Sequence, residues 1–153
     1  MHKAKVSKFR YAGKKRPDNY KLYPIEEVHK KFREWEQLGT INYRKKHGIL
    51  DTFDGYPVKT WSQRYTLFLT NTKCVCCGLE ANCYILEKEW DSKAYHFNLY
   101  YVNGDKEILF TKDHIIPASK GGLNAMENYQ TMCSPCNYRK GARYDSPECT
   151  AHR

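Results

Sequence analysis

The chain has 153 residues, of which 41% are hydrophobic and 14% aromatic, enough for one packed domain with an appended arm. It contains no run of about 18 apolar residues and no secretory signal at its start, so we expect no membrane association and a cytoplasmic location. The formal net charge is +9, and it is unevenly distributed: residues 1–72 hold 16 Lys and Arg against 7 Asp and Glu, whereas residues 73–153 hold 10 of each. This asymmetry predicts a polyanionic partner for the N-terminal half, with a solvated tail as the alternative.

The first 22 residues are basic and lack apolar periodicity, which predicts a flexible arm that becomes ordered on binding. Cations in this arm could follow a phosphate backbone or enter a minor groove. The candidate DNA contacts in the arm are Arg10, Lys14, Lys15 and Arg16.

A helix is predicted over residues 24–38, because Pro24 suits a first helical position and Gly39 suits a stop. Apolar residues recur there at spacings of three and four, which predicts a core-facing stripe. The stripe consists of Ile25, Val28, Phe32, Trp35 and Leu38. A shorter helix is predicted over residues 61–69. We therefore expect residues 23–72 to form a helical DNA-binding extension.

The pattern changes to strands in the second half. Residues 94–102 and 107–116 are rich in β-branched and aromatic residues, and Asn103-Gly104 between them predicts a hairpin turn. Residues 129–132 are predicted to form a short returning strand. A last helix is predicted from Ser134-Pro135 to about Arg143, and residues 144–153 are expected to form a tail.

Four of the seven cysteines form two C-x-x-C pairs, Cys74 with Cys77 and Cys133 with Cys136. Two such pairs can supply the four corners of a closed, structural Zn²⁺ site. Cys76 is an alternative to Cys77, but Cys77 reproduces the spacing of the second pair and is followed by Gly78. The quartet indicates a zinc module, a feature that nucleic-acid-binding proteins share with enzymes.

The most specific motif runs from Lys112 to Gly141 and reads K-D-H-I-I-P-A-S-K-G-G-L-N-A-M-E-N-Y-Q-T-M-C-S-P-C-N-Y-R-K-G. Over residues 74–141 the chain resembles the HNH (ββα-metal) endonuclease family in its four-cysteine form. The resemblance implies an α+β fold: a ββα-metal (HNH, His-Me finger) core stapled by a four-cysteine zinc site, with a basic, mainly helical N-terminal extension. Residues 73–143 would form the nuclease domain.

The resemblance also implies roles for the site residues. His114 would be the general base, and Asp113 and Asn137 would hold one Mg²⁺ or Mn²⁺ ion, which prefers such hard oxygen ligands. Asn128 would order the loop and orient His114, with Asn124 as a nearby rival. Adjacent strand residues point to opposite faces. For Asp113 and His114 to serve one site, we therefore expect the regular pleat to break at these positions.

Lys140 lies three residues after Asn137 on the same helix face and is a candidate for holding a phosphate. The leading hypothesis is thus a metal-dependent DNA endonuclease, as a nickase or homing enzyme, a restriction-type cutter or a branched-DNA resolvase. A zinc-containing nucleic-acid-binding module without catalysis is the alternative, and a colicin-like toxin domain is a weaker one. The sequence leaves open whether the protein is a homodimer.

Overall fold

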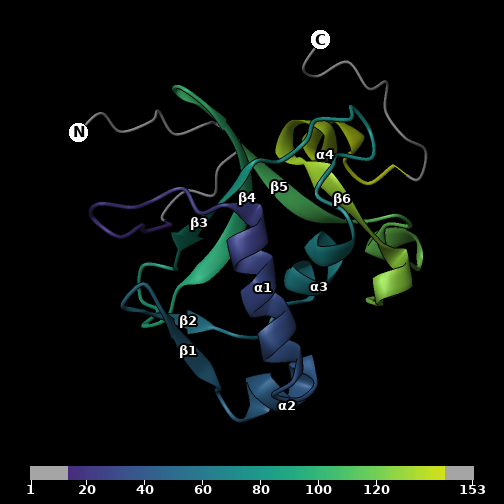
Figure 1. Ribbon diagram of the computed structural model, residues 1–153. Coiled ribbons are helices and arrows are strands. Elements are labelled where there is room, and N and C mark those ends of the chain that lie inside the picture. Colours follow the sequence, from purple (N-terminus) through teal and green to yellow (C-terminus); the bar gives the residue numbers. More distant parts are fainter. Residues whose placement is uncertain (1–13, 144–153) are drawn as a thin grey trace.

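The structure is a computed structural model, and residues 14–143 are described here (Figure 1). It is an α+β fold, as predicted, in which helices pack on a four-stranded antiparallel sheet. Arg10, Cys149 and the predicted tail lie outside the described residues. Among residues 14–143, no helix has both the length and the apolar composition needed to span a bilayer.

The sheet has the strand order β3-β4-β5-β6, and every neighbouring pair is antiparallel. Its strands are β3 (Cys83–Glu87), β4 (His96–Asn103), β5 (Lys106–His114) and β6 (Tyr129–Cys133). The predicted hairpin is β4–β5, but its two-residue loop is Gly104-Asp105, one residue later than predicted, because Asn103 still pairs with Lys106. Gly104 has a φ of 59°, which glycine adopts readily.

The sheet divides beyond this turn (Figure 1). β4 and β5 pair only as far as Tyr100 and Leu109. From there β4 continues along β3, whereas β5 continues along β6, from Phe110 opposite Cys133 to His114 opposite Tyr129. The far end of β5 is therefore separated from β4, and helix α3 packs against β5 and β6.

The N-terminal half combines helices with a short hairpin. It contains α1 (Ile25–Glu36), α2 (Ile41–Lys46), the hairpin β1 (Leu50–Phe53) and β2 (Tyr56–Lys59), and α3 (Gln63–Thr70). The stripe predicted for α1 buries Val28, Phe32 and Trp35, while Leu38 lies beyond the helix and is exposed. α3 begins two residues after the predicted start, because the Ser62 hydroxyl accepts a hydrogen bond from the Arg64 amide and caps the helix.

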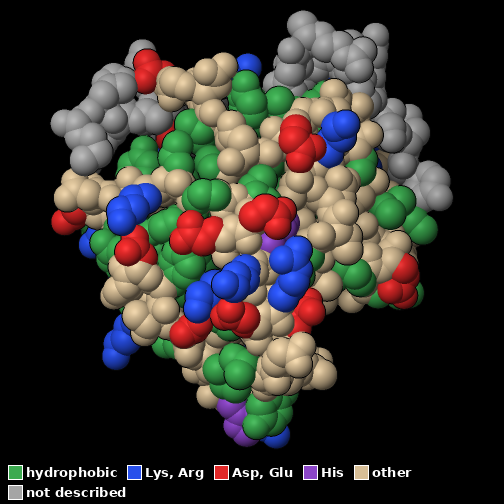
Figure 2. Space-filling model, in the orientation of Figure 1, with side chains coloured by type: hydrophobic (Ala, Val, Ile, Leu, Met, Phe, Trp, Pro, Cys, Tyr) green, Lys and Arg blue, Asp and Glu red, His purple; other side chains and the backbone are tan. Residues whose placement is uncertain are grey.

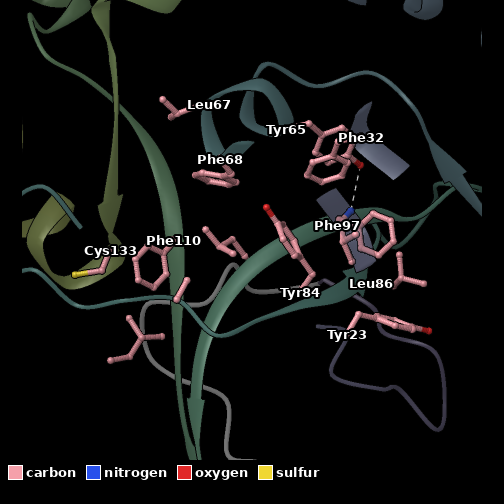
Figure 3. Packing of buried hydrophobic residues seen from close by; sticks show 14 of the residues in the cluster. Tyr23, Phe32, Tyr65, Leu67, Phe68, Tyr84, Leu86, Phe97, Phe110 and Cys133 are labelled. Carbon is pink, nitrogen blue, oxygen red and sulfur yellow. Dashed lines mark hydrogen bonds between the residues drawn. The ribbon is translucent and has the colours of Figure 1, made fainter. Parts of the chain in front are cut away.

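Aromatic side chains from both halves meet in one core (Figure 3). Phe32 of α1 stacks on Tyr65 of α3, with ring centroids 4.1 Å apart, and packs edge-on against Tyr84 of β3. The Tyr65 hydroxyl accepts a hydrogen bond from the Phe97 amide of β4. The N-terminal helices therefore share the core of the sheet, so α1 and α3 hold the sheet in place as well as adding surface to it.

Residues 14–22 of the predicted flexible arm are folded along the edge of β3. Lys15 and Lys88 exchange backbone hydrogen bonds, and Tyr23 pairs with Tyr84. The Arg16 guanidinium is buried and binds the carboxylates of Glu87 and Glu107. This part of the arm is ordered because its backbone completes the sheet edge and its arginine neutralises two buried acids.

The last helix, α4 (Ser134–Lys140), is shorter than predicted. Cys133 occupies the N-cap position predicted for Ser134, whose hydroxyl instead donates to the Leu109 carbonyl of β5. Two 3₁₀ turns, η1 (Ala118–Lys120) and η2 (Met126–Asn128), form the connection between β5 and β6.

Candidate active site and zinc centre

Four sulfur atoms converge where β6 meets α4. The Sγ atoms of Cys74, Cys77, Cys133 and Cys136 all lie within 4.8 Å of one another. The Val75 amide donates to the Thr131 carbonyl of β6, which places the first pair beside the second. Cys77, rather than Cys76, joins the cluster, as its spacing predicted. Four converging thiols fit a structural zinc site.

The thiols of this cluster perturb one another's ionisation. A hydrogen bond from Cys133 lowers the pKa of Cys74 to about 4, and the same interaction raises the pKa of Cys133. Burial raises the pKa of Cys136 to about 12. Only some of these thiols can ionise side by side, whereas a divalent cation would stabilise all four as thiolates.

Asp113 lies on the face of β5 that α4 covers, and it is buried. Its Oδ2 atom accepts a hydrogen bond from Gln130 Nε2 at 2.9 Å and lies 3.1 Å from the Lys140 ammonium. Lys140 also donates to the carbonyl oxygen of His114 at 2.9 Å. Only 2% of the Lys140 side chain is exposed, so in this structure it is a buried partner of Asp113, where the sequence suggested a phosphate contact.

His114 follows at the end of the same strand. The pairing of β5 with β6 stays regular through His114, so the break in the pleat predicted at positions 113 and 114 is absent. The His114 ring packs edge-on against Tyr129 of β6, and its Nε2 atom lies 2.8 Å from Asn124 Oδ1. A carboxamide oxygen can only accept, so in the neutral tautomer Nε2 carries the proton and Nδ1 is the acceptor.

Asn128 holds the loop that follows His114. Its Oδ1 accepts from the Ile116 amide, and its Nδ2 donates to the carbonyls of Ile116 and Leu123. Gly122 lies beneath the same carbonyl: a Cβ there would stand 1.7 Å from the Ile116 oxygen. Asn128 therefore orders the loop, while the contact to His114 comes from Asn124, the residue that the sequence placed second.

Asn137 lies in the first half of α4. It packs beside Thr111 of β5, two residues before Asp113, and so does not face Asp113 directly. Its Nδ2 donates to Thr111 Oγ1 at 2.8 Å. Thr111 and Asp113 are two residues apart on one face of β5, a separation of about 6.6 Å along a strand. The structure thus brings Asp113, His114 and Lys140 together, with Asn137 one pleat repeat away.

A pocket of about 250 Å³ opens at the end of β5. Asp113, His114, Ser119 and Lys140 are among the residues that line it. It places the carboxylate of Asp113 and the cation of Lys140 at the strand end that carries His114, a set that can bind a phosphate-containing substrate.

The arm contacts predicted for DNA have other partners in the structure. Lys14 forms an ion pair with Glu89, Lys15 lies over the ring of Trp90, and Arg16 is buried between two glutamates. Gln130 and Thr111 contact the predicted site residues Asp113 and Asn137 and were not singled out by the sequence. A register for β5 and β6 would have identified Gln130, since it opposes Asp113 directly.

Residues 103–149 match the family model described as HNH endonuclease. Comparisons with curated proteins and with solved structures gave no match. The matched segment covers less than half of the chain, and it contains Asp113, His114 and the second cysteine pair. The resemblance seen in the sequence is confirmed: residues 103–149 match the HNH endonuclease family, and the four-cysteine cluster that closes onto this segment fits a zinc site.

Proposed function

We propose that this protein is a metal-dependent endonuclease that hydrolyses phosphodiester bonds of DNA. The observation that carries the proposal is the position of His114, whose Nε2 is bound by Asn124 at the end of the strand that also presents Asp113. The consecutive elements β5, β6 and α4 form a strand–strand–helix unit around this site, which supports a ββα-metal core.

His114 acts as the general base in this proposal. Because its Nε2–H is bound by Asn124, the Nδ1 lone pair is available to take a proton from an attacking water. Tyr129 supports the ring from one side, so the imidazole is held by a ring contact and a hydrogen bond. Both contacts fix the orientation of the ring, and a general base must be oriented toward the proton that it abstracts.

Asp113 and Asn137 would hold one Mg²⁺ or Mn²⁺ ion. Both offer hard oxygen ligands, and Thr111 binds the amide nitrogen of Asn137, which leaves the amide oxygen for a ligand role. A bound ion of this kind stabilises charge on the phosphate and the leaving oxygen. Lys140 is within 3.1 Å of the same carboxylate, so it would shift toward a phosphate oxygen when the site is loaded.

The four cysteines would bind structural zinc and anchor α4, which carries Asn137 and Lys140. This chemistry needs the four clustered thiols to stay reduced. DNA is the proposed partner, and the number of subunits in the active form is left open. The rival function is a zinc-containing nucleic-acid-binding module that does not cleave.

A supercoiled-plasmid assay tests the proposal. Wild-type protein with Mg²⁺ is expected to give open-circular or linear DNA, and EDTA should prevent cleavage. His114→Ala should lower the rate by about 10²–10⁴-fold, the usual contribution of a general base. His47→Ala is a matched control, because His47 is exposed at the end of α2.

Cleavage by wild type and the His47→Ala control, but not by the His114→Ala protein, would support the enzyme. DNA binding without cleavage, unaffected by His114→Ala or by divalent metal, would favour the zinc-binding module instead. The ratio of open-circular to linear product would distinguish nicking from double-strand cutting.

A further inference from the structure

We propose that Arg64 and Lys112 form a phosphate track that holds the DNA strand next to the scissile bond on the α3 side of β5. The inference rests on the proposed function and specifies the surface along which the substrate runs. It also assigns a DNA-binding role to α3, which lies outside the segment matched by the family model.

The first step is the shared face of Lys112 and His114. These residues are two positions apart on β5, and side chains at that spacing leave a strand on the same side. Both contact one ring: the Lys112 ammonium lies 4.1 Å from the centroid of Tyr129, and the His114 ring lies 5.1 Å from it. The intervening Asp113 points to the other face, toward Lys140. A cation therefore stands beside the proposed base.

The second step is the position of α3 at the place where the sheet divides (Figure 1). The first turn of α3 binds both separated strands. Gln63 accepts a hydrogen bond from Lys112 of β5 at 2.9 Å, while Arg64 donates to Asn98 of β4 at 3.2 Å. The guanidinium also lies 3.4 Å from the His96 ring nitrogen. Lys112 is thus held by Gln63, the residue that precedes Arg64 in the first turn of α3.

The third step is charge. Within residues 14–143, neither Arg64 nor Lys112 forms an ion pair with a carboxylate, because their side-chain partners are neutral amides and aromatic rings. Both residues are partly exposed, so a ligand can reach them. Two partly exposed cations without a carboxylate ion pair can each bind an anion, and successive phosphates of one strand supply it.

The outer face of α1 provides a contrast. Figure 2 shows Lys and Arg side chains there interspersed with Asp and Glu, and Lys31 pairs with both Glu34 and Asp51. Lys31 is therefore already paired with neighbouring acids. The α3 side of β5 therefore has the stronger claim to a polyanion.

The test measures DNA affinity against salt concentration by fluorescence anisotropy with a labelled duplex, using His114→Ala protein so that no DNA is cut. The slope of log K against log[salt] is negative, and each lost phosphate contact makes it shallower by about 0.9. Arg64→Gln and Lys112→Gln should each make the slope shallower by about 0.9, and the double variant by about 1.8. The matched control is Lys45→Gln with Lys46→Gln, the same change of charge on exposed residues of α2, at the opposite end of the molecule from α4 (Figure 1).

Arg64→Lys and Lys112→Arg separate charge from folding. They alter the hydrogen bonds of the first turn of α3 but keep the charge, so they should keep the slope even where the melting temperature falls. An unchanged slope in the glutamine variants, or an equal fall in the α2 control, would overturn the track. Wild-type cleavage of plasmid DNA separates the two proposals. If the wild type cleaves DNA and the glutamine variants keep the slope, the track alone is refuted. If the wild type neither cleaves nor binds DNA, the proposed function is refuted as well.

Discussion

At the scale of single residues, the two asparagines after His114 divide a task that the sequence assigned chiefly to Asn128. Asn128 binds backbone atoms of Ile116 and Leu123, whereas Asn124 binds the imidazole. Spacing alone could not separate them, because the difference depends on how the loop folds back. That fold depends on Gly122, which leaves room for the Ile116 carbonyl.

We therefore predict that Asn124→Ala lowers the cleavage rate about 10-fold or more at an unchanged melting temperature, because His114 loses the acceptor that fixes its tautomer. The ¹⁵N chemical shifts of the His114 ring should show Nε2 losing its preference for the proton. Asn124→Asp keeps an acceptor and should keep the tautomer.

Asn128→Ala is the contrasting variant. It removes three part-buried hydrogen bonds to the backbone of the loop, so it should lower the free energy of unfolding by about 1–3 kcal/mol. If Asn124→Ala proved the more destabilising of the two in chemical denaturation, the division of roles would be wrong.

At the scale of elements, periodicity and turn chemistry predicted α1, the β4–β5 hairpin, β6 and the start of the C-terminal helix with errors of at most two residues. These features depend on local sequence. The division of the sheet was not predicted, because it depends on which strand β5 pairs with beyond Leu109. The same reason hid Gln63 and Gln130, which become partners of Lys112 and Asp113 only once the strands are placed.

The cysteine pairs are the long-range contact that spacing did predict, and they lead to a prediction for the junction of β6 and α4. Cys136→Ser should abolish binding of one zinc equivalent and lower the melting temperature, because metal-binding energy contributes to folding. Cys83→Ser is the control: Cys83 is a buried cysteine of β3 outside the cluster, so this variant should keep its zinc. Metal content by mass spectrometry and a thermal melt check both. Full zinc occupancy in the Cys136→Ser protein would contradict a four-thiolate site.

At the scale of the whole molecule, the charge asymmetry pointed to a polyanion-binding N-terminal half. The structure shows why net charge does not identify the contacts. Arg16 contributes to the excess positive charge, yet it neutralises Glu87 and Glu107, two acids from the balanced half of the chain. Arg64 also belongs to the basic half, and it has no carboxylate partner among residues 14–143.

Arg16 instead fastens the N-terminal segment to the sheet, which gives a prediction for the stability of the whole domain. Its side chain is 7% exposed and those of both glutamates are 1% exposed. Removing one partner of such a buried pair leaves uncompensated charge in the interior, so Arg16→Met should lower the free energy of unfolding by about 3–5 kcal/mol. Lys14→Met is the matched control, because its partner Glu89 is 61% exposed and such a pair contributes about 0–1 kcal/mol.

Urea denaturation of the two variants compares them directly. Similar losses in both would mean that residues 14–22 are held by the backbone pairing of Lys15 with Lys88 rather than by the guanidinium. A much larger loss for Arg16→Met, partly recovered when Glu107→Gln removes one of the two buried charges, would show that this arginine joins the two halves of the chain into one cooperative unit.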